Sequence, residues 1–354
     1  MAGITKKTGK IRAGKFFTLL AFFVAGLGIV HAQTSTRVQP PVAPAKPAPQ
    51  RTPIRVAIGR INNDSGIPAE KAIAVDPKAN VQFCVGSGNI KVSGWNRNEV
   101  RAMIDDGSYV GFKVLNKTVQ NSPAVVRIVG YDTQKISVGG ANDCLRGERI
   151  EIDVPRGASV RLEGTQGQVR AEIASVYKAD IKNNSGDIIF NEIAQGINAQ
   201  TYQGDVSVEN SGGAMNLNTT NGNIFVYNVK PIEFSNIFFA KTNSGSINLQ
   251  AVEHPQIGIK SISGEIRFAG NFLSGGQYSF DTQNGSIQLT IPKKSSFAVA
   301  ATYGYGDFKS DIQMVNITKT SGQPQKLTGQ TGTGDATLTL STLVGSINIK
   351  TNEP

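Results

Sequence analysis

The second half of the chain repeats one pattern of apolar and polar positions. Each unit reads apolar-x-[Thr/Ser]-x-x-Gly-x-[Ile/Val]-x-apolar. Apolar residues two positions apart line one face of a β-strand. The pattern therefore predicts two short strands per unit, separated by a turn in which glycine accepts a positive φ without steric cost. The glycines of the pattern are Gly186, Gly204, Gly222, Gly245, Gly264, Gly285, Gly306, Gly334 and Gly345.

The spacing of these glycines indicates how the units assemble. The first seven follow one another at 18, 18, 23, 19, 21 and 21 residues. A unit of this length cannot bury its apolar face alone, so neighbouring units must stack. An antiparallel meander is the alternative, but it would place a comparable turn about every 8–12 residues. We therefore expect an all-β fold: a single-stranded β-solenoid of about nine coils over residues 176–354.

A row of hydroxyl side chains is a second feature of the repeat. Thr or Ser stands three positions before most of the glycines, as at Thr219, Thr242 and Ser261. Stacking would align these side chains in a ladder beside the turn, a favourable cross-strand arrangement. Tyr303 occupies the same inward position, so we interpret it as structural, whereas the role of the nearby Tyr305 stays open.

Residues 81–175 are also rich in strand signals but lack the regular period. We interpret them as an N-terminal β-sheet that begins and caps the stack, because solenoids need atypical end units to protect their open edges. Residues 54–80 carry weak signals and are interpreted as a weakly ordered lead-in. The strand candidates of the cap are 81–85, 89–95, 99–104, 109–115, 124–130, 149–154, 159–164 and 168–173.

The N-terminus has the organisation of a secretory signal. Basic residues up to Lys15 precede a 15-residue apolar run, and Val30-His31-Ala32 supplies small side chains for cleavage. We predict a signal peptide over 1–32. An uncleaved anchor is the alternative, although the run is short for a membrane span of about 20 residues. Residues 33–53 hold six of the 15 prolines and predict a semi-rigid linker, or a tail left by processing.

Composition narrows the functional classes. The net charge is +10, but five cations and no acidic residue lie in the first 32 residues, so the remainder carries +5. This balance argues against nucleic acid as a partner. Only His254 remains outside the signal segment, and two cysteines cannot build a Cys-rich cluster. The sequence therefore predicts no metal site and no cofactor.

The repeat units and the cap strands resemble a known family. The pieces that carry the resemblance are NIKVSGWNRNEVRA (89–102), IEIDVPRGASVRLEGTQGQV (150–169) and repeats such as NSGDI, NGNIFV, NSGSINL and NGSIQLTIP. Over roughly residues 80–350 they look like the putative adhesin domain family of exported bacterial proteins, a β-solenoid domain of unknown function. The resemblance implies an envelope or surface location and a non-catalytic role, and it supplies no catalytic residues.

Acidic residues just after the repeat glycines are the first candidates for chemistry. Asp187 and Asp205 hold equivalent places in adjacent units, so stacking would bring them about 5 Å apart. Two carboxylates at that distance could act together on a glycosidic bond. The alternative is a turn-flanking position that accepts any small polar residue, because Asn223 and Ser246 occupy the same place.

Other motifs give little support for a catalytic or metal site. Calcium-binding solenoids need tandem G-G-x-G-x-D turns, which are absent, as are the glycine-rich phosphate loops. His254 precedes Pro255 between two units, and we expect it to be a solvated loop residue. Trp95 could present a stacking surface for sugar, although a lone Trp in a β-protein more often packs over its neighbours.

Cys84 and Cys144 are the only cysteines. In an exported protein an even number of cysteines predicts a disulfide, here one that closes a loop of about 60 residues. Two unpaired buried thiols are the alternative.

These observations favour an exported, non-enzymatic binding or structural protein of the bacterial cell envelope or surface, adhesin-like in character. Its partner would be an envelope protein or a polysaccharide, and it would meet a membrane only through an uncleaved N-terminal segment. A carbohydrate-active hydrolase or lyase on a β-helix, and an accessory protein of envelope signalling, are the alternatives. Clustered acidic and basic residues in a groove would favour the enzyme, whereas an exposed apolar strip would favour a binding role.

Overall fold

The computed structural model describes residues 69–105, 109–115, 125–131, 143–165 and 167–352, all within the compact unit Arg55–Pro354. These residues form twenty-six strands and no helix. The predicted all-β fold class is therefore confirmed. The signal peptide predicted for 1–32 and the linker predicted for 33–53 lie outside the described residues.

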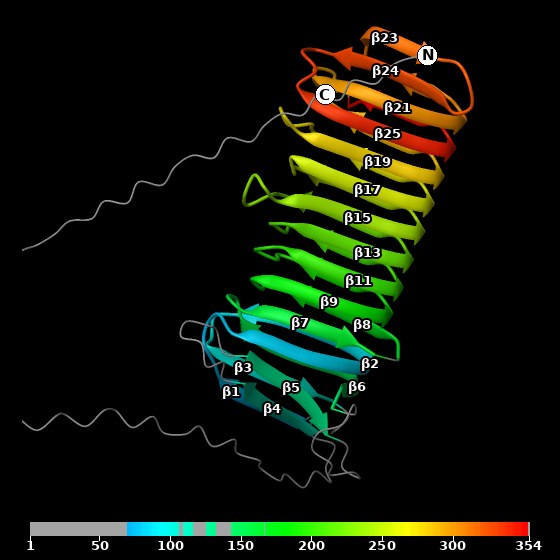
Figure 1. Cartoon of the computed structure of the whole chain (residues 1–354). Coiled ribbons are helices and arrows are strands. Elements are labelled where there is room, and N and C mark those ends of the chain that lie inside the picture. The colour runs from blue at the N-terminus through cyan, green and yellow to red at the C-terminus, as the bar shows by residue number, and fades with distance from the viewer. Residues whose placement is uncertain (1–68, 106–108, 116–124, 132–142, 166, 353–354) are drawn as a thin grey trace, which may run out of the picture. The chain divides into compact units, whose positions relative to one another are not determined.

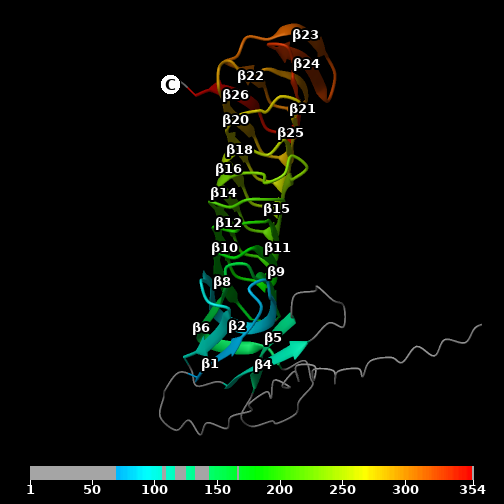
Figure 2. The same ribbon diagram turned by 90° about the vertical axis from the view of Figure 1, so that its left-hand side faces the viewer.

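The repeat units stack as coils with two strands each. Within the stack, each strand pairs in parallel with the equivalent strand of the next coil, as β11 (Ile197–Gln203) does with β9 (Lys178–Ser185) and β13 (Met215–Asn221). The strands that precede the glycine turns form one side of the ladder in Figure 1, here called the front sheet. The strands that follow the turns form the back sheet, and Figure 2 shows the two sheets as parallel columns. This arrangement is the predicted β-solenoid.

The front sheet comprises, in spatial order, β7 (Ser159–Gly164), β9, β11, β13, β15 (Ile237–Ser244), β17 (Gln256–Ser263), β19 (Gln277–Asn284), β25 (Ala336–Val344) and β21 (Phe297–Tyr305). The back sheet comprises β8 (Val169–Ala174), β10 (Ile188–Asn191), β12 (Val206–Glu209), β14 (Ile224–Val229), β16 (Ile247–Val252), β18 (Ile266–Ala269), β20 (Ile287–Ile291), β26 (Ile347–Thr351) and β22 (Phe308–Ser310).

The core lies between the two sheets. The side chains two positions after the glycines, such as Ile188, Ile247 and Ile287, are fully buried there. The predicted hydroxyl row lies beside them. Its members donate to the carbonyl of the glycine in the neighbouring coil, as Thr219 does to Gly204 at 2.9 Å, except that Thr331 donates to the carbonyl of Ser295. The row therefore satisfies a buried carbonyl in each coil, which would otherwise carry a desolvation cost.

Close approach of the coils explains the repeated glycine more fully than backbone conformation does. A Cβ on Gly222 would collide with the carbonyl oxygen of Gly204, and a Cβ on Gly285 with that of Gly264. Neither of these two glycines has a φ in the left-handed region, unlike Gly204 (φ 139°). The shared requirement is therefore the space that a side chain would take from the neighbouring carbonyl.

The N-terminal cap is built around one long strand. Segments 81–85 and 89–95, predicted as separate strands, form the single strand β2 (Asn80–Trp95), which pairs with both β7 and β8. On its other side β2 pairs with β5 (Val125–Tyr131) and β6 (Leu145–Pro155). The antiparallel strands β4 (Tyr109–Leu115), β3 (Glu99–Ile104) and β1 (Ala69–Ala74) complete the end of the stack.

At the C-terminal end the spatial order departs from the chain order. The coil of β25 and β26 lies between the coil of β19 and β20 and the coil of β21 and β22. Beyond the coil of β21 and β22, two antiparallel strands close the stack. β24 (Gln325–Thr331) pairs with β21, and β23 (Val315–Thr320) pairs with β24. Gly334, predicted as a repeat glycine, instead lies between β24 and β25 beside Gln330.

Candidate binding surface

The carboxylates that follow the repeat glycines form hydrogen bonds within the stack. Oδ1 of Asp187 accepts the backbone N–H of Asp205 at 2.9 Å, and Oδ1 of Asp205 accepts that of Asn223 at 2.7 Å. Asn223 continues the row by accepting the N–H of Ser246 at 2.9 Å. Because any side chain with an acceptor atom can fill this place, the geometry favours the turn-flanking interpretation over a catalytic pair.

His254 is buried, and the prediction of a solvated loop residue is wrong. The ring has no exposed surface, packs edge-on against Phe238 at a centroid distance of 5.6 Å, and lies 2.8 Å through Nε2 from the carbonyl oxygen of Gly213. A carbonyl only accepts, so Nε2 carries the proton, while Nδ1 has no hydrogen-bond partner among the residues that the structure describes. Burial lowers the pKa of His254 below its usual value of 6.5.

Packing within the protein accounts for two of the three aromatic candidates from the sequence, Trp95 and Tyr303. Trp95 donates from its indole N–H to the carbonyl of Glu99 at 2.8 Å, and the guanidinium carbons of Arg97 and Arg101 lie 4.9 and 5.6 Å from its ring centroid. Its ring is therefore occupied by protein groups. Tyr303 is buried, as predicted, whereas Tyr305 is exposed.

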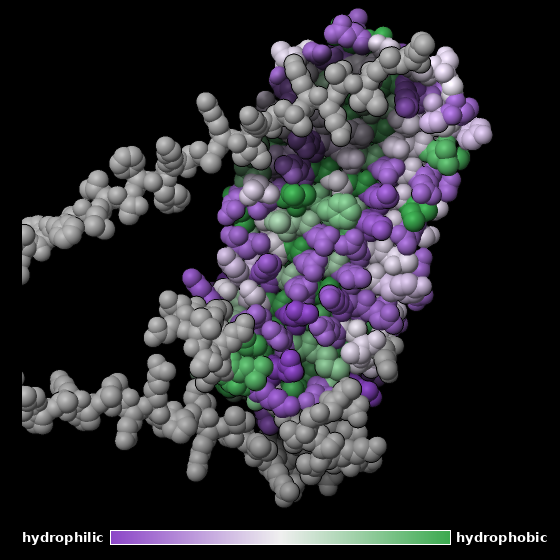
Figure 3. All heavy atoms as spheres, viewed as in Figure 1, coloured by the Kyte–Doolittle hydropathy of each residue, from purple (hydrophilic) through white to green (hydrophobic). Residues whose placement is uncertain are grey.

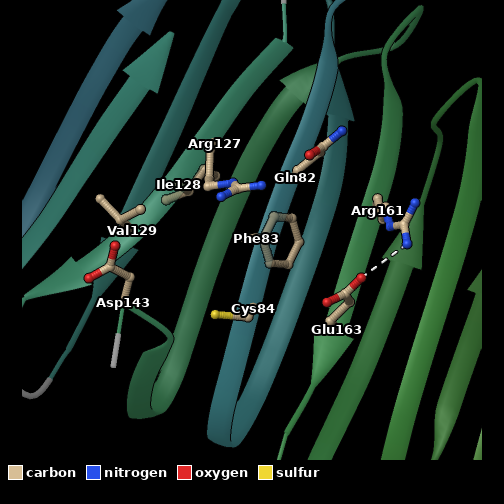
Figure 4. Close-up of a pocket in the computed structure, with 9 residues that line it drawn as sticks. All are labelled: Gln82, Phe83, Cys84, Arg127, Ile128, Val129, Asp143, Arg161 and Glu163. Atoms are coloured by element: carbon tan, nitrogen blue, oxygen red, sulfur yellow. Dashed lines mark hydrogen bonds and ion pairs between the residues drawn. The ribbon is translucent and has the colours of Figure 1, made fainter. Parts of the chain in front are cut away.

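A disulfide joins Cys84 of β2 to Cys144, with a Cα–Cα distance of 4.6 Å, as the sequence predicts. Beside it lies a pocket of about 230 Å³, shown in Figure 4. Two ion pairs flank this pocket, Arg161 with Glu163 at 3.0 Å and Lys113 with Asp143 at 2.9 Å. Asp143, Arg161 and Glu163 thus already have partners, whereas Arg127, which also lines the pocket, has no ion pair among the described residues.

Two features are absent from the described part of the chain. No group of three or more His, Cys, Asp or Glu side chains gathers there in a way that could hold a metal ion. Within the same residues, no helix has the length and apolar character needed to cross a membrane.

The outer face of the front sheet is long and mostly hydrophilic (Figure 3). In its N-terminal part, side chains bond to one another along the stack. Nδ2 of Asn198 donates to Asp180 and Nδ2 of Asn216 donates to Asn198, both at 2.8 Å. Asn218 donates in turn to Asn216 at 2.8 Å. This ladder uses the polar groups of the face to hold neighbouring coils in register.

Further along the same face the side chains surround a hollow. Gly258 lies between Phe239 and Ser279 in the register of the sheet, and the ring of Phe239 leans toward the place where a Cβ on Gly258 would be. The hollow has a volume of about 360 Å³ and extends over β15, β17, β19 and β25. We call it the Gly258 hollow. Its outward lining side chains are those of Ile237, Gln256, Gln277, Ser279, Thr337 and Thr339.

An exposed apolar segment stands at one edge of this face. The connection between β14 and β15 is longer than its neighbours and presents Ile232 and Phe234, which are 49% and 72% exposed. The side-chain oxygen of Asn236 accepts the backbone N–H groups of Ile232 and Glu233 at 2.8 and 3.0 Å, so the turn has a defined shape. We call residues 230–237 the apolar connection.

Sequence reasoning identified neither the hollow nor the apolar connection. Gly258 carries a weak signal, because it is a small residue at an outward position of a predicted strand. The 23-residue interval from Gly222 to Gly245 signals the longer connection. Neither signal shows which side chains of neighbouring coils lie beside these residues.

Comparisons with solved structures find several proteins that are similar to this chain at low sequence identity. Two come from Parabacteroides distasonis ATCC 8503: a putative adhesin (12% identity, TM-score 0.46, 81% of this chain and 98% of that one) and a putative lipid binding protein (12% identity, TM-score 0.41, 80% and 97%). A third is a putative adhesin from Bacteroides fragilis NCTC 9343 (13% identity, TM-score 0.34, 80% and 98%). No curated protein sequence matches this chain significantly.

The sequence profile of one family matches nearly all of the described residues. The Toastrack DUF4097 profile aligns with residues 67–227 and again with 211–350. The two matches together cover the N-terminal cap and the stacked coils, as the resemblance seen in the sequence implies. The chain belongs to the Toastrack DUF4097 family.

Proposed function

We propose that this chain is an exported, non-enzymatic binding protein of the bacterial cell envelope, adhesin-like in character. The observation that carries the proposal is the outer face of the front sheet, a long and regular surface on which the Gly258 hollow leaves polar groups free to meet a partner. The face is built on a rigid stack, which suits a surface that must present the same groups over several coils.

The hydrogen bonding of the acidic row supports a non-enzymatic role. A retaining glycosidase needs one carboxylate to attack the sugar and another to protonate the leaving group. Asp187 and Asp205 each accept a backbone N–H from the next coil, which directs an oxygen of each along the stack. A catalytic role for this pair is therefore disfavoured.

The disulfide supports export. Disulfides persist in oxidising compartments such as the periplasm and the cell surface, and they are rare in the cytosol. The Cys84–Cys144 bond is consistent with the signal peptide predicted for residues 1–32.

Fractionation tests this proposal. Full-length chain expressed in a bacterial host is expected outside the cytoplasm, with Gln33 as its first residue and with both thiols protected from labelling. The purified chain should bind an envelope protein or polysaccharide in a pull-down from an envelope fraction. An intact N-terminus on cytoplasmic protein would reject export, and depolymerisation of a polysaccharide would reject the non-enzymatic role.

The apolar connection favours a second candidate, docking to another envelope protein. Exposed aromatic side chains on a fixed turn are suited to anchor a protein interface. If this candidate holds, Phe234→Ser should remove the captured protein while Phe225→Ser, an equally drastic change on the back sheet, should retain it.

A further inference from the structure

The polar side chains around the Gly258 hollow lack hydrogen-bond partners in the described part of the chain. No described residue forms a hydrogen bond with the side chain of Gln256, Gln277, Ser279 or Thr339. The amides of Asn198 and Asn216, on the same face, bond to each other instead. Amide and hydroxyl groups that converge on a hollow, and that are free, are suited to a ligand with many hydroxyl groups.

The hollow is uncharged. None of its outward lining side chains carries a formal charge. Beside the hollow, Lys260 forms an ion pair at 3.4 Å with Asp281 of the adjacent coil, and this pair has no net charge. An acidic ligand would lose hydration here without gaining a cationic partner. The electrostatics of the hollow therefore favour a neutral ligand.

Apolar side chains lie at one end of the Gly258 hollow, next to its polar side chains. Ile237 is 50% exposed, and the ring of Phe239 stands over Gly258. Such groups pack against the C–H faces of sugar rings, while amides and hydroxyls take the sugar hydroxyls. Successive coils are about 4.8 Å apart, a spacing comparable to the length of one hexopyranose unit.

We propose that the Gly258 hollow binds a neutral polysaccharide whose chain runs along the stack, with Gln256, Gln277, Ser279 and Thr339 bonding to its hydroxyl groups. Gly258, which has no side chain, leaves the floor of the hollow open beside the ring of Phe239. This inference rests on the proposed binding function and names its ligand class. A protein partner at the same hollow is the competing outcome of the test.

Affinity electrophoresis tests the assignment with defined probes. The mature chain is run through gels that contain a neutral polysaccharide (dextran, laminarin, mannan, xyloglucan or hydroxyethyl cellulose) or an acidic one (alginate or polygalacturonate). We expect retardation in at least one neutral gel and none in the acidic gels. Gly258→Thr fills the hollow and should weaken binding by roughly tenfold or more, because the sugar loses contacts that water cannot replace.

Stability controls separate loss of the site from loss of the fold. No backbone atom lies near the missing Cβ of Gly258, and the nearest atom, Cδ2 of Phe239 at 3.3 Å, belongs to a partly exposed ring that can shift. Gly258→Thr should therefore unfold in urea close to the parent's midpoint. The double variant Gln256→Ala, Gln277→Ala should also weaken binding. Gln200→Ala, an exposed amide on β11 of the same sheet, is the matched control and should bind like the parent.

Two results would overturn the assignment. If the parent is retarded in no neutral gel, or only in acidic gels, the ligand class is wrong. If it is retarded but Gly258→Thr binds equally well, the hollow is not the site. In either case the proposed function still stands if the envelope pull-down captures a partner, and it fails separately if that experiment captures nothing.

Discussion

Thr342 donates its hydroxyl hydrogen to the carbonyl oxygen of Gly285 at 2.8 Å, across 57 residues of sequence. In coils that follow one another along the chain, the same bond spans only 15 residues (Thr219 to Gly204) or 20 (Thr242 to Gly222). The long span arises because the coil of β25 and β26 is placed between two coils that precede it in the sequence. Neighbours in space are therefore not neighbours in the chain at this end.

Paired cysteines would test this order. Ser346 donates its backbone N–H to Oγ of Ser286 at 3.2 Å, so the two residues occupy adjacent coils. Neighbouring parallel strands are about 4.8 Å apart, within the Cα range of about 4.4–6.8 Å that a disulfide needs. We expect Ser286→Cys, Ser346→Cys to cross-link on oxidation, as detected by peptide mapping. The pair Ser286→Cys, Asp307→Cys spans two coils and should stay reduced. The reverse pattern would mean that coils stack in chain order.

The cause of the glycine row can be tested at Gly222. Gly222→Ala should destabilise the protein by about 1–3 kcal/mol or more, because its methyl group would meet the carbonyl oxygen of Gly204. Gly258→Ala is the matched control. There the nearest atom, Cδ2 of Phe239 at 3.3 Å, belongs to a partly exposed ring that can shift, so the change should be neutral or stabilise by about 0.5–1 kcal/mol. Urea unfolding measures both. Equal effects at the two positions would remove close approach as the explanation.

The row of Asp187 and Asp205 yields a prediction about acceptors. Asp205→Asn keeps an oxygen for the N–H of Asn223 and should change stability little. Asp205→Ala leaves that N–H without its acceptor and should cost about 1–3 kcal/mol in urea unfolding. If Asp205→Asn is as damaging as Asp205→Ala, the negative charge rather than the hydrogen bond is what stabilises the turn.

His254 predicts a dependence of stability on pH. Its pKa is lowered in the folded protein, so below about pH 6.5 the unfolded chain binds a proton that the folded chain does not. Above that pH the residue contributes no dependence. Below it the free energy of unfolding should fall by up to about 1.4 kcal/mol per pH unit, until the pH reaches the folded pKa. His254→Gln does not titrate, so the difference between its pH profile and the parent's isolates this contribution. Parallel profiles between pH 5 and 7 would contradict the prediction.

A corner at the end of several back strands offers a stabilising substitution. Asn210, Asn228 and Ala251 all have a positive φ, near 50°, and Nδ2 of Asn228 donates to Oδ1 of Asn210 at 2.8 Å. Alanine is strained in this conformation, which asparagine tolerates. We expect Ala251→Asn to extend the amide row and to raise the free energy of unfolding by about 0.5–1 kcal/mol. Ala269→Asn, the same exchange within β18, should lower it slightly. A loss of stability at Ala251 would show that the corner is not under strain.

Several features of this protein follow from the sequence alone. The period-two apolar pattern around each glycine predicts the inward side chains, and Ile188, Ile247 and Ile287 are indeed fully buried. The strands, the hydroxyl row and the partnership of Cys84 with Cys144 follow in the same way. These features depend on alternation within a strand, on turn chemistry or on the count of cysteines, all of which can be read from the sequence without knowing which coils are neighbours.

Only the tertiary structure decided which coils touch. The repeat pattern is the same on every coil, so it cannot specify that Gly345, rather than Gly306, stacks on Gly285. The burial of His254 depends on the carbonyl of Gly213, which lies 41 residues earlier, and the Gly258 hollow depends on Phe239 and Ser279 from the adjacent coils. Such contacts form between coils that stacking brings together. The apolar pattern of one coil does not specify which other coil lies next to it.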